Sequence, residues 1–137
     1  MREKIDCFLP CADIADLAET IGDLSASKTV QHIHLLTGDA NNINNIPQGV
    51  ELLETRHPLS TDAILQIAER TDAEYVLIST KPTPVRLGQH SLERFLRVAA
   101  DANAAMVYSD HYSVVEGTVV RHPVIDYQKG SVRDDFD

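Results

Sequence analysis

The sequence predicts an α/β fold in three layers, with a mostly parallel β-sheet between helices and a β-hairpin near the C-terminus. Short apolar runs alternate along the chain with segments whose apolar residues recur at helical spacing. This alternation is typical of βαβ units, whose strands pair in parallel. The length of 137 residues corresponds to one domain at about 150 residues per domain, so we expect a single domain over residues 1–137.

Five apolar runs have the length and boundaries of buried strands. Proline, glycine or polar residues close each run, as is common at strand ends. The predicted strands are residues 5–9, 30–36, 50–54, 75–78 and 105–108. Two further short runs flank Glu116-Gly117 and predict the hairpin, because glycine readily takes the positive φ that a tight hairpin turn needs.

Three segments carry an apolar stripe at helical spacing, over residues 14–24, 63–68 and 92–99. Asp13 is the expected N-cap of the first helix, and Ser60 or Thr61 caps the second. The segment between residues 40 and 49 is rich in asparagine and contains Pro47, which indicates a loop.

The net charge is −9, from 21 acidic and 12 basic side chains. This balance argues against nucleic acid or an anionic membrane as the main partner, because both attract basic surfaces. No apolar run approaches the roughly 18 residues of a transmembrane segment, and the N-terminus has no apolar signal core. With only Cys7 and Cys11, we expect reduced thiols and a cytoplasmic location.

In open parallel sheets, ligands bind beyond the carboxyl ends of the strands. The segments after the predicted strands supply five candidate donor-binding residues, which are Pro10, Asp13, Asp39, Lys81 and Asp110. A helix start can hold a phosphate, a carboxylate can hold a ribose hydroxyl, and a lysine can neutralise a phosphate. Each charged residue also has a structural alternative. Asp13 could be a helix cap, Asp39 part of an Asx turn, Lys81 a solvated loop lysine and Asp110 a strand-end cap.

His32 and His34 lie two residues apart and therefore share one face of a strand. Two imidazoles can bind a metal ion, but the sequence identifies no third ligand near them, so we assign no metal ligand. A metal-dependent hydrolase using these two residues and Asp110 is the least favoured hypothesis. Dinucleotide-binding, phosphate-loop and nucleophile-elbow motifs are missing from the sequence, which argues against the enzymes that carry them.

Four stretches resemble, in their order and spacing, a known family. An opening strand ends in proline, a second ends in a small acidic turn, a third follows Asp72-Ala73-Glu74, and a fourth precedes a glycine turn and His122-Pro123. The stretches are residues 5–10, 33–39, 72–78 and 106–110. In these features the chain resembles the N-terminal, nucleotide-sugar-binding part of bacterial family 2 glycosyltransferases, which implies their Rossmann-like GT-A fold.

The resemblance implies a nucleotide-diphosphate sugar as donor, Mn²⁺ or Mg²⁺ as cofactor, and inverting transfer of the sugar to an acceptor. By position, Pro10, Asp13 and Asp39 would contact the base and ribose. Where the family carries Asp-x-Asp, this chain has Ser79-Thr80-Lys81, which offers no carboxylate pair to a metal ion. Lys81 could neutralise the diphosphate in its place.

The family's acceptor half, with its catalytic base, would follow the point where this sequence ends. We therefore expect a truncated domain that binds the donor, is inactive alone and acts with the rest of a parent chain. The alternative is a non-catalytic α/β binding or regulatory domain with a degenerate donor site. An exposed sheet edge could also pair with a second copy and form a homo-oligomer.

Overall fold

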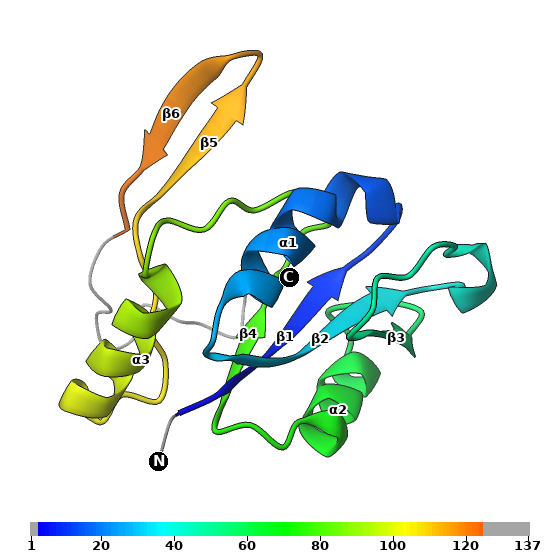
Figure 1. The fold of residues 1–137 in the computed structure, drawn as a ribbon, viewed down its shortest axis with the longest axis horizontal. Helices are drawn as coiled ribbons and strands as arrows, with labels where there is room; N and C mark the ends of the chain where they lie inside the picture. The colour runs from blue at the N-terminus through cyan, green and yellow to red at the C-terminus, as the bar shows by residue number, and fades with distance from the viewer. Residues whose placement is uncertain (1–2, 125–137) are drawn as a thin grey trace, which may run out of the picture. The chain divides into compact units, whose positions relative to one another are not determined.

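The computed structural model describes residues 3–124, which form an α/β fold in two compact units (Figure 1). The N-terminal unit, Met1–Arg97, contains a four-stranded sheet, and the C-terminal unit, Val98–Asp137, contains a two-stranded hairpin. Among the described residues, no helix has both the length and the apolar character that a membrane span requires.

Every pair of neighbouring strands in the four-stranded sheet is parallel. The strand order is β3-β2-β1-β4. The strands are β1 (Ile5–Pro10), β2 (Val30–Thr37), β3 (Val50–Glu54) and β4 (Tyr75–Ile78). The predicted parallel sheet is thus confirmed for four of the five expected strands, each of which begins and ends within one residue of its prediction.

One face of the sheet packs against the first helical segment. The alternate β1 side chains Ile5, Cys7 and Leu9 point to this face and are buried in its core. They pack against a 3₁₀ turn, Ile14–Leu17, and against α1 (Ala18–Ala26), which follows it directly. The predicted helix therefore starts with a tighter first turn than an α-helix has.

The opposite face of the sheet packs against α2 (Thr61–Arg70). Phe8, Leu36 and Leu53 from three strands form an apolar cluster with Ile67 of this helix. Ser60 caps α2 by accepting the backbone N–H of Ala63 at 3.2 Å, which decides between the two predicted caps. Because β1 lies between two strands and under helices on both faces, all six of its residues are buried.

The third predicted helix is present as α3 (Ser91–Ala102). The fifth predicted strand, residues 105–108, was wrong, because the described part of the chain has no strand there. The apolar run suggested a buried strand, but the side chain of Met106 is 79% exposed. A strand also needs a neighbour for its backbone hydrogen bonds, and an apolar run does not specify that neighbour.

The hairpin of the C-terminal unit consists of β5 (His111–Val115) and β6 (Thr118–His122), which pair in antiparallel register. Glu116 and Gly117 at its tip both have positive φ, of 49° and 78°. A type I′ turn requires this combination, and its second position is where glycine is most often found. The predicted hairpin and the role of Gly117 are confirmed.

Candidate functional site

A cavity of about 390 Å³ lies at the carboxyl ends of the four parallel strands in the N-terminal unit. Its walls come from the segments that follow β1, β2, β3 and β4. The lining residues are Pro10, Cys11, Ala12, Leu36, Gly38, His57, Pro58, Leu59, Thr80 and Pro82. The volume falls within the range of about 300–1,000 Å³ that is typical of small-molecule sites.

The strand order explains why a cavity forms at this place. The chain runs outward from β1 to β2 and β3, and then crosses back to place β4 on the other side of β1. The strand order therefore reverses between β1 and β4, which is where open parallel sheets form their binding crevice. The structure thus has a cavity at the carboxyl ends of the strands, where the sequence predicted ligand binding.

Only one of the predicted donor-binding residues, Pro10, lines this cavity. Asp13 caps the 3₁₀ turn by accepting the N–H of Ala15 at 2.9 Å. Asp39 accepts the backbone N–H of Asn41 at 3.0 Å and the side-chain amide of Asn42 at 2.8 Å. Both carboxylates therefore hold local turns, as in the capping and Asx-turn alternatives.

Lys81 lies between two lining residues, Thr80 and Pro82, without being a lining residue itself. The hydroxyl of Ser79 donates a hydrogen bond to the Lys81 carbonyl at 3.0 Å and thereby shapes this loop. Within the described residues the ammonium group of Lys81 makes no ion pair. A positive charge at the edge of the cavity is therefore available to an anionic ligand.

Asp110 belongs to the C-terminal unit, where it stabilises the base of the hairpin. Its carboxylate accepts the backbone N–H of Val124 at 2.9 Å and Nη2 of Arg121 at 3.0 Å. The hydrogen bond from Val124 and then that from Arg121 hold the pKa of this carboxyl below its ordinary value. Asp110 is therefore ionised at neutral pH and already paired.

The sequence reasoning missed His57, an exposed imidazole that lines the cavity just after β3. A signal was present, because His57 follows the predicted strand at residues 50–54 and so also lies beyond the carboxyl end of a strand. Cys11 also lines the cavity, but burial, followed by the charges of Asp13 and Asp16, raises the pKa of its thiol. It is therefore protonated and a poor nucleophile at neutral pH.

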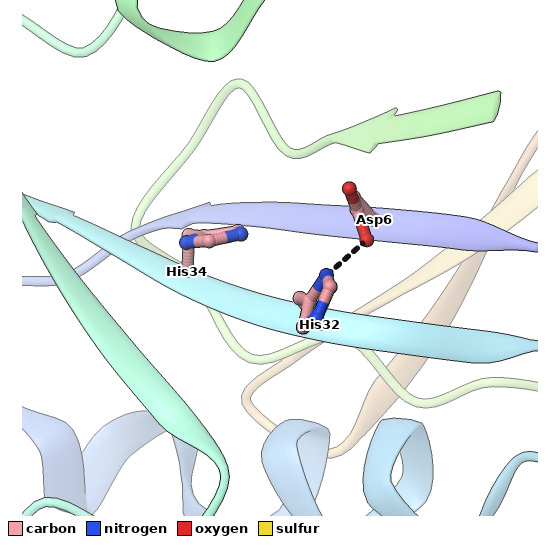
Figure 2. Close-up of side chains that lie close together, drawn as sticks. All are labelled: Asp6, His32 and His34. Carbon is pink, nitrogen blue, oxygen red and sulfur yellow. Dashed lines mark hydrogen bonds and ion pairs between the residues drawn. The ribbon is translucent and has the colours of Figure 1, made fainter. Parts of the chain in front are cut away.

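A second cluster lies elsewhere in the same unit, where Asp6 of β1 meets His32 and His34 of β2 (Figure 2). Asp6 pairs with His32 and Phe8 with His34 in the parallel register of the two strands. Residues that alternate along a strand share one face, so the cluster lies on the face that α2 covers. None of the three residues lines the cavity.

Asp6 is completely buried and is held by four hydrogen bonds. Its Oδ1 lies 3.0 Å from Nδ1 of His32, and its Oδ2 accepts the Thr71 hydroxyl at 2.8 Å and the N–H groups of Asp72 and Ala73 at 3.1 and 3.3 Å. Burial raises the pKa of the Asp6 carboxyl, but the hydrogen bonds outweigh burial and bring it below the ordinary value. A buried carboxylate thus joins β1 to β2 and to the start of β4.

His34 is buried, with 4% of its side chain exposed, and its ring stacks on Phe8 with centroids 4.7 Å apart. Its Nδ1 lies 3.5 Å from Oε2 of Glu51, yet neither ring nitrogen has a hydrogen-bond partner among the described residues. Burial lowers the pKa of this imidazole more than the nearby carboxylates raise it. His34 is therefore neutral near pH 7 and retains an unused lone pair.

The sequence identified the two histidines as a pair but missed Asp6, which lies 26 residues before His32. A signal was present, since Asp6 is the one charged residue in the apolar run at residues 5–9. A carboxylate buried in such a strand needs polar partners in the fold. The partner's identity depends on strand register, which the sequence alone did not give.

Three comparisons with known proteins identified no relative of this chain. No protein-family model, curated protein or solved structure matches the chain.

Proposed function

We propose that the N-terminal unit binds the donor of a glycosyltransferase reaction, a nucleotide-diphosphate sugar, as part of a three-layer, Rossmann-like GT-A domain. The single observation that carries this function is the cavity of about 390 Å³ at the carboxyl ends of β1 to β4. Open parallel sheets bind nucleotides at this edge, where the strand order reverses between β1 and β4.

The chemistry of the walls suits the two ends of such a ligand. Pro58, Leu59 and Pro82 present flat or apolar surfaces against which a base can pack, with Thr80 and His57 as hydrogen-bonding groups. Lys81 at the edge carries the positive charge that a diphosphate needs in a protein with a net charge of −9. Because Ser79-Thr80-Lys81 contains no carboxylate, we expect Mn²⁺ or Mg²⁺ to add little to binding.

The experiment measures the affinity of the chain for UDP, GDP, dTDP and CDP and for their sugars by calorimetry, with and without Mn²⁺. Ala12 is exposed and lines the cavity, so Ala12→Leu fills it. Ala15 is exposed and does not line the cavity, so Ala15→Leu is the matched control. We expect Ala12→Leu to weaken binding by at least about tenfold, as a lost good contact of about 1.4 kcal/mol would do.

A charge variant tests the placement of the diphosphate. Lys81→Gln should weaken binding of a nucleoside diphosphate several-fold but leave binding of the nucleoside unchanged, because only the diphosphate carries the charge that Lys81 meets. The exposed Lys28 is the matched control, as Lys28→Gln. Absence of binding by every nucleotide, or equal effects of Ala12→Leu and Ala15→Leu, would refute the donor site.

One observation favours the alternative, a non-catalytic binding domain. Asp13 and Asp39 are occupied in local turns, and among the described residues no carboxylate lines the cavity. A domain of this kind would bind a nucleotide or another small ligand without hydrolysing or transferring a sugar. It is distinguished by joining the unit to a longer parent chain and assaying transfer, because a donor-binding half regains activity there and a binding module does not.

A further inference from the structure

The Asp6, His32 and His34 cluster has the composition and spacing of a metal site. Each residue offers one ligand atom, and these atoms all lie within 4.8 Å of one another. In a tetrahedral site with bonds of about 2.1 Å, ligand atoms are roughly 3.4 Å apart. Nδ1 of His32 and Oδ1 of Asp6 lie 3.0 Å apart, close to this separation, and the ligand atom of His34 lies within 4.8 Å of both.

His34 gives the independent indication that a ligand belongs at this place. Buried polar groups in folded proteins almost always have a hydrogen-bond partner, because an unpaired one costs about 1–3 kcal/mol. Both nitrogens of this buried ring lack such a partner within the described residues. Figure 2 shows the ring extending along the sheet toward the Asp6–His32 pair. A metal ion bound there would use the lone pair that the fold leaves unused.

A carboxylate also lies near His34, on the side where a metal-binding imidazole needs an outer-shell partner. Histidine ligands usually donate their second ring N–H to a carboxylate, which fixes the tautomer and the ring orientation. Oε2 of Glu51 lies 3.5 Å from Nδ1 of His34, which leaves Nε2 as the ligand atom of that ring. Oδ2 of Asp6 is held by Thr71 and two backbone amides, so its Oδ1 is fixed in the direction of the histidines.

We propose that Asp6, His32 and His34 bind a divalent first-row transition-metal ion, zinc being the ion we would test first, between β1 and β2. Two imidazole nitrogens and one carboxylate oxygen favour zinc, iron or cobalt over magnesium and calcium, which prefer all-oxygen sites. Three protein ligands leave a fourth position for water, as in catalytic zinc sites. His32 is 42% exposed, so one of the three ligands is in contact with solvent.

This site is independent of the nucleotide site, since none of its three residues lines the cavity. Failure of nucleotide binding would therefore leave it intact, and the reverse also holds. A second place that could bind a metal ion is the stacked His111–His122 pair of the hairpin, with ring centroids 4.8 Å apart. Two imidazoles can bind a metal ion weakly, so the experiment has to separate the two places.

The experiment uses the full chain, without a histidine tag and stripped of metal with a chelator. Titration with Co²⁺ reports four-coordinate binding by its visible spectrum, and calorimetry with Zn²⁺ and with Fe²⁺ under nitrogen ranks the ions. We expect saturation at one equivalent, a tetrahedral Co²⁺ spectrum, and no displacement by about a 100-fold excess of Mg²⁺.

His34→Phe is the decisive variant, because it removes both ring nitrogens, keeps an aromatic ring against Phe8 and breaks no hydrogen bond. It should remain folded and lose Zn²⁺ affinity by more than about 100-fold. His90→Asn is the matched control, since it removes an imidazole from the same unit at a positive φ of 58°, which asparagine tolerates. It should bind as the parent chain does.

Two outcomes would overturn the metal site. One is the absence of saturable Zn²⁺, Co²⁺ or Fe²⁺ binding in the stripped chain. The other is binding that survives His34→Phe but disappears in His111→Phe, which would assign the ion to the hairpin pair.

Discussion

At the residue scale, the carboxylate of Asp6 makes more hydrogen bonds than any other buried polar side chain of the described residues. Its Oδ2 accepts three hydrogen bonds that fix the segment between α2 and β4, and its Oδ1 meets His32. A carboxylate can accept at every one of these positions, whereas an amide has only one accepting oxygen. An amide would have to place that oxygen at the Oδ2 position and turn its NH₂ toward Nδ1 of His32, so the geometry favours an acid here whether or not a metal ion is bound.

Asp6→Asn is expected to lower the free energy of unfolding of the metal-free chain by roughly 1–3 kcal/mol, because a neutral amide oxygen accepts these hydrogen bonds less strongly than a carboxylate does. Urea unfolding followed by circular dichroism measures the change. The neighbouring Asp72 has a side chain that is 71% exposed, so Asp72→Asn is a control that should stay within about 0.5 kcal/mol of the parent. Equal stabilities for the two variants would show that Asp6 does not hold the loop.

At the element scale, the base of the hairpin is held by a carboxylate, Asp110, whose hydrogen bonds to Arg121 and Val124 depend on pH. The Val124 N–H and then Arg121 lower the pKa of the Asp110 carboxyl. A carboxyl whose folded pKa is depressed contributes stability above its ordinary value near pH 3.8, and this contribution is lost as the pH falls through the lowered folded pKa. The base of the hairpin should therefore loosen only in strong acid.

This expectation can be measured by following the amide resonance of Val124 by NMR between neutral pH and pH 2. The resonance should shift with a midpoint below 3.8, as its acceptor becomes protonated. In Asp110→Asn the side chain keeps an accepting oxygen but cannot titrate, so the same resonance should stay constant over this range. A midpoint at or above the ordinary carboxyl pKa of 3.8 would show that these hydrogen bonds do not stabilise the ionised Asp110.

The elements also show how far the sequence could predict this fold and its sites. Four strands, three helices and the Gly117 turn were predictable because each is specified by local signals, namely an apolar run, a cap or a required positive φ. The segment at residues 105–108 failed because strand formation depends on a neighbour. Asp6 was missed as a partner of His32 for the same reason, since their meeting depends on register across strands.

At the scale of the whole molecule, the N-terminal unit holds two candidate sites. The cavity lies at the carboxyl ends of the strands, and the Asp6, His32 and His34 cluster lies on the face that α2 covers, without lining the cavity. Leu36 lines the cavity, however, and is only two residues from His34 on β2. The two sites are therefore close enough along one strand for coupling to be a meaningful question.

Thermal unfolding of the N-terminal sheet can decide whether the sites are coupled. A ligand at about 100 times its dissociation constant adds about 2.7 kcal/mol to the folded state, which raises the melting temperature by several degrees for a chain of this size. Because no residue is shared, we expect the stabilisation by a nucleotide and that by Zn²⁺ to add within about 0.5 kcal/mol. His34→Phe should remove the Zn²⁺ increment alone, and Ala12→Leu the nucleotide increment alone. If stripping the metal abolished the nucleotide increment, the ion would belong to the nucleotide site, and the separation of the two sites would be wrong.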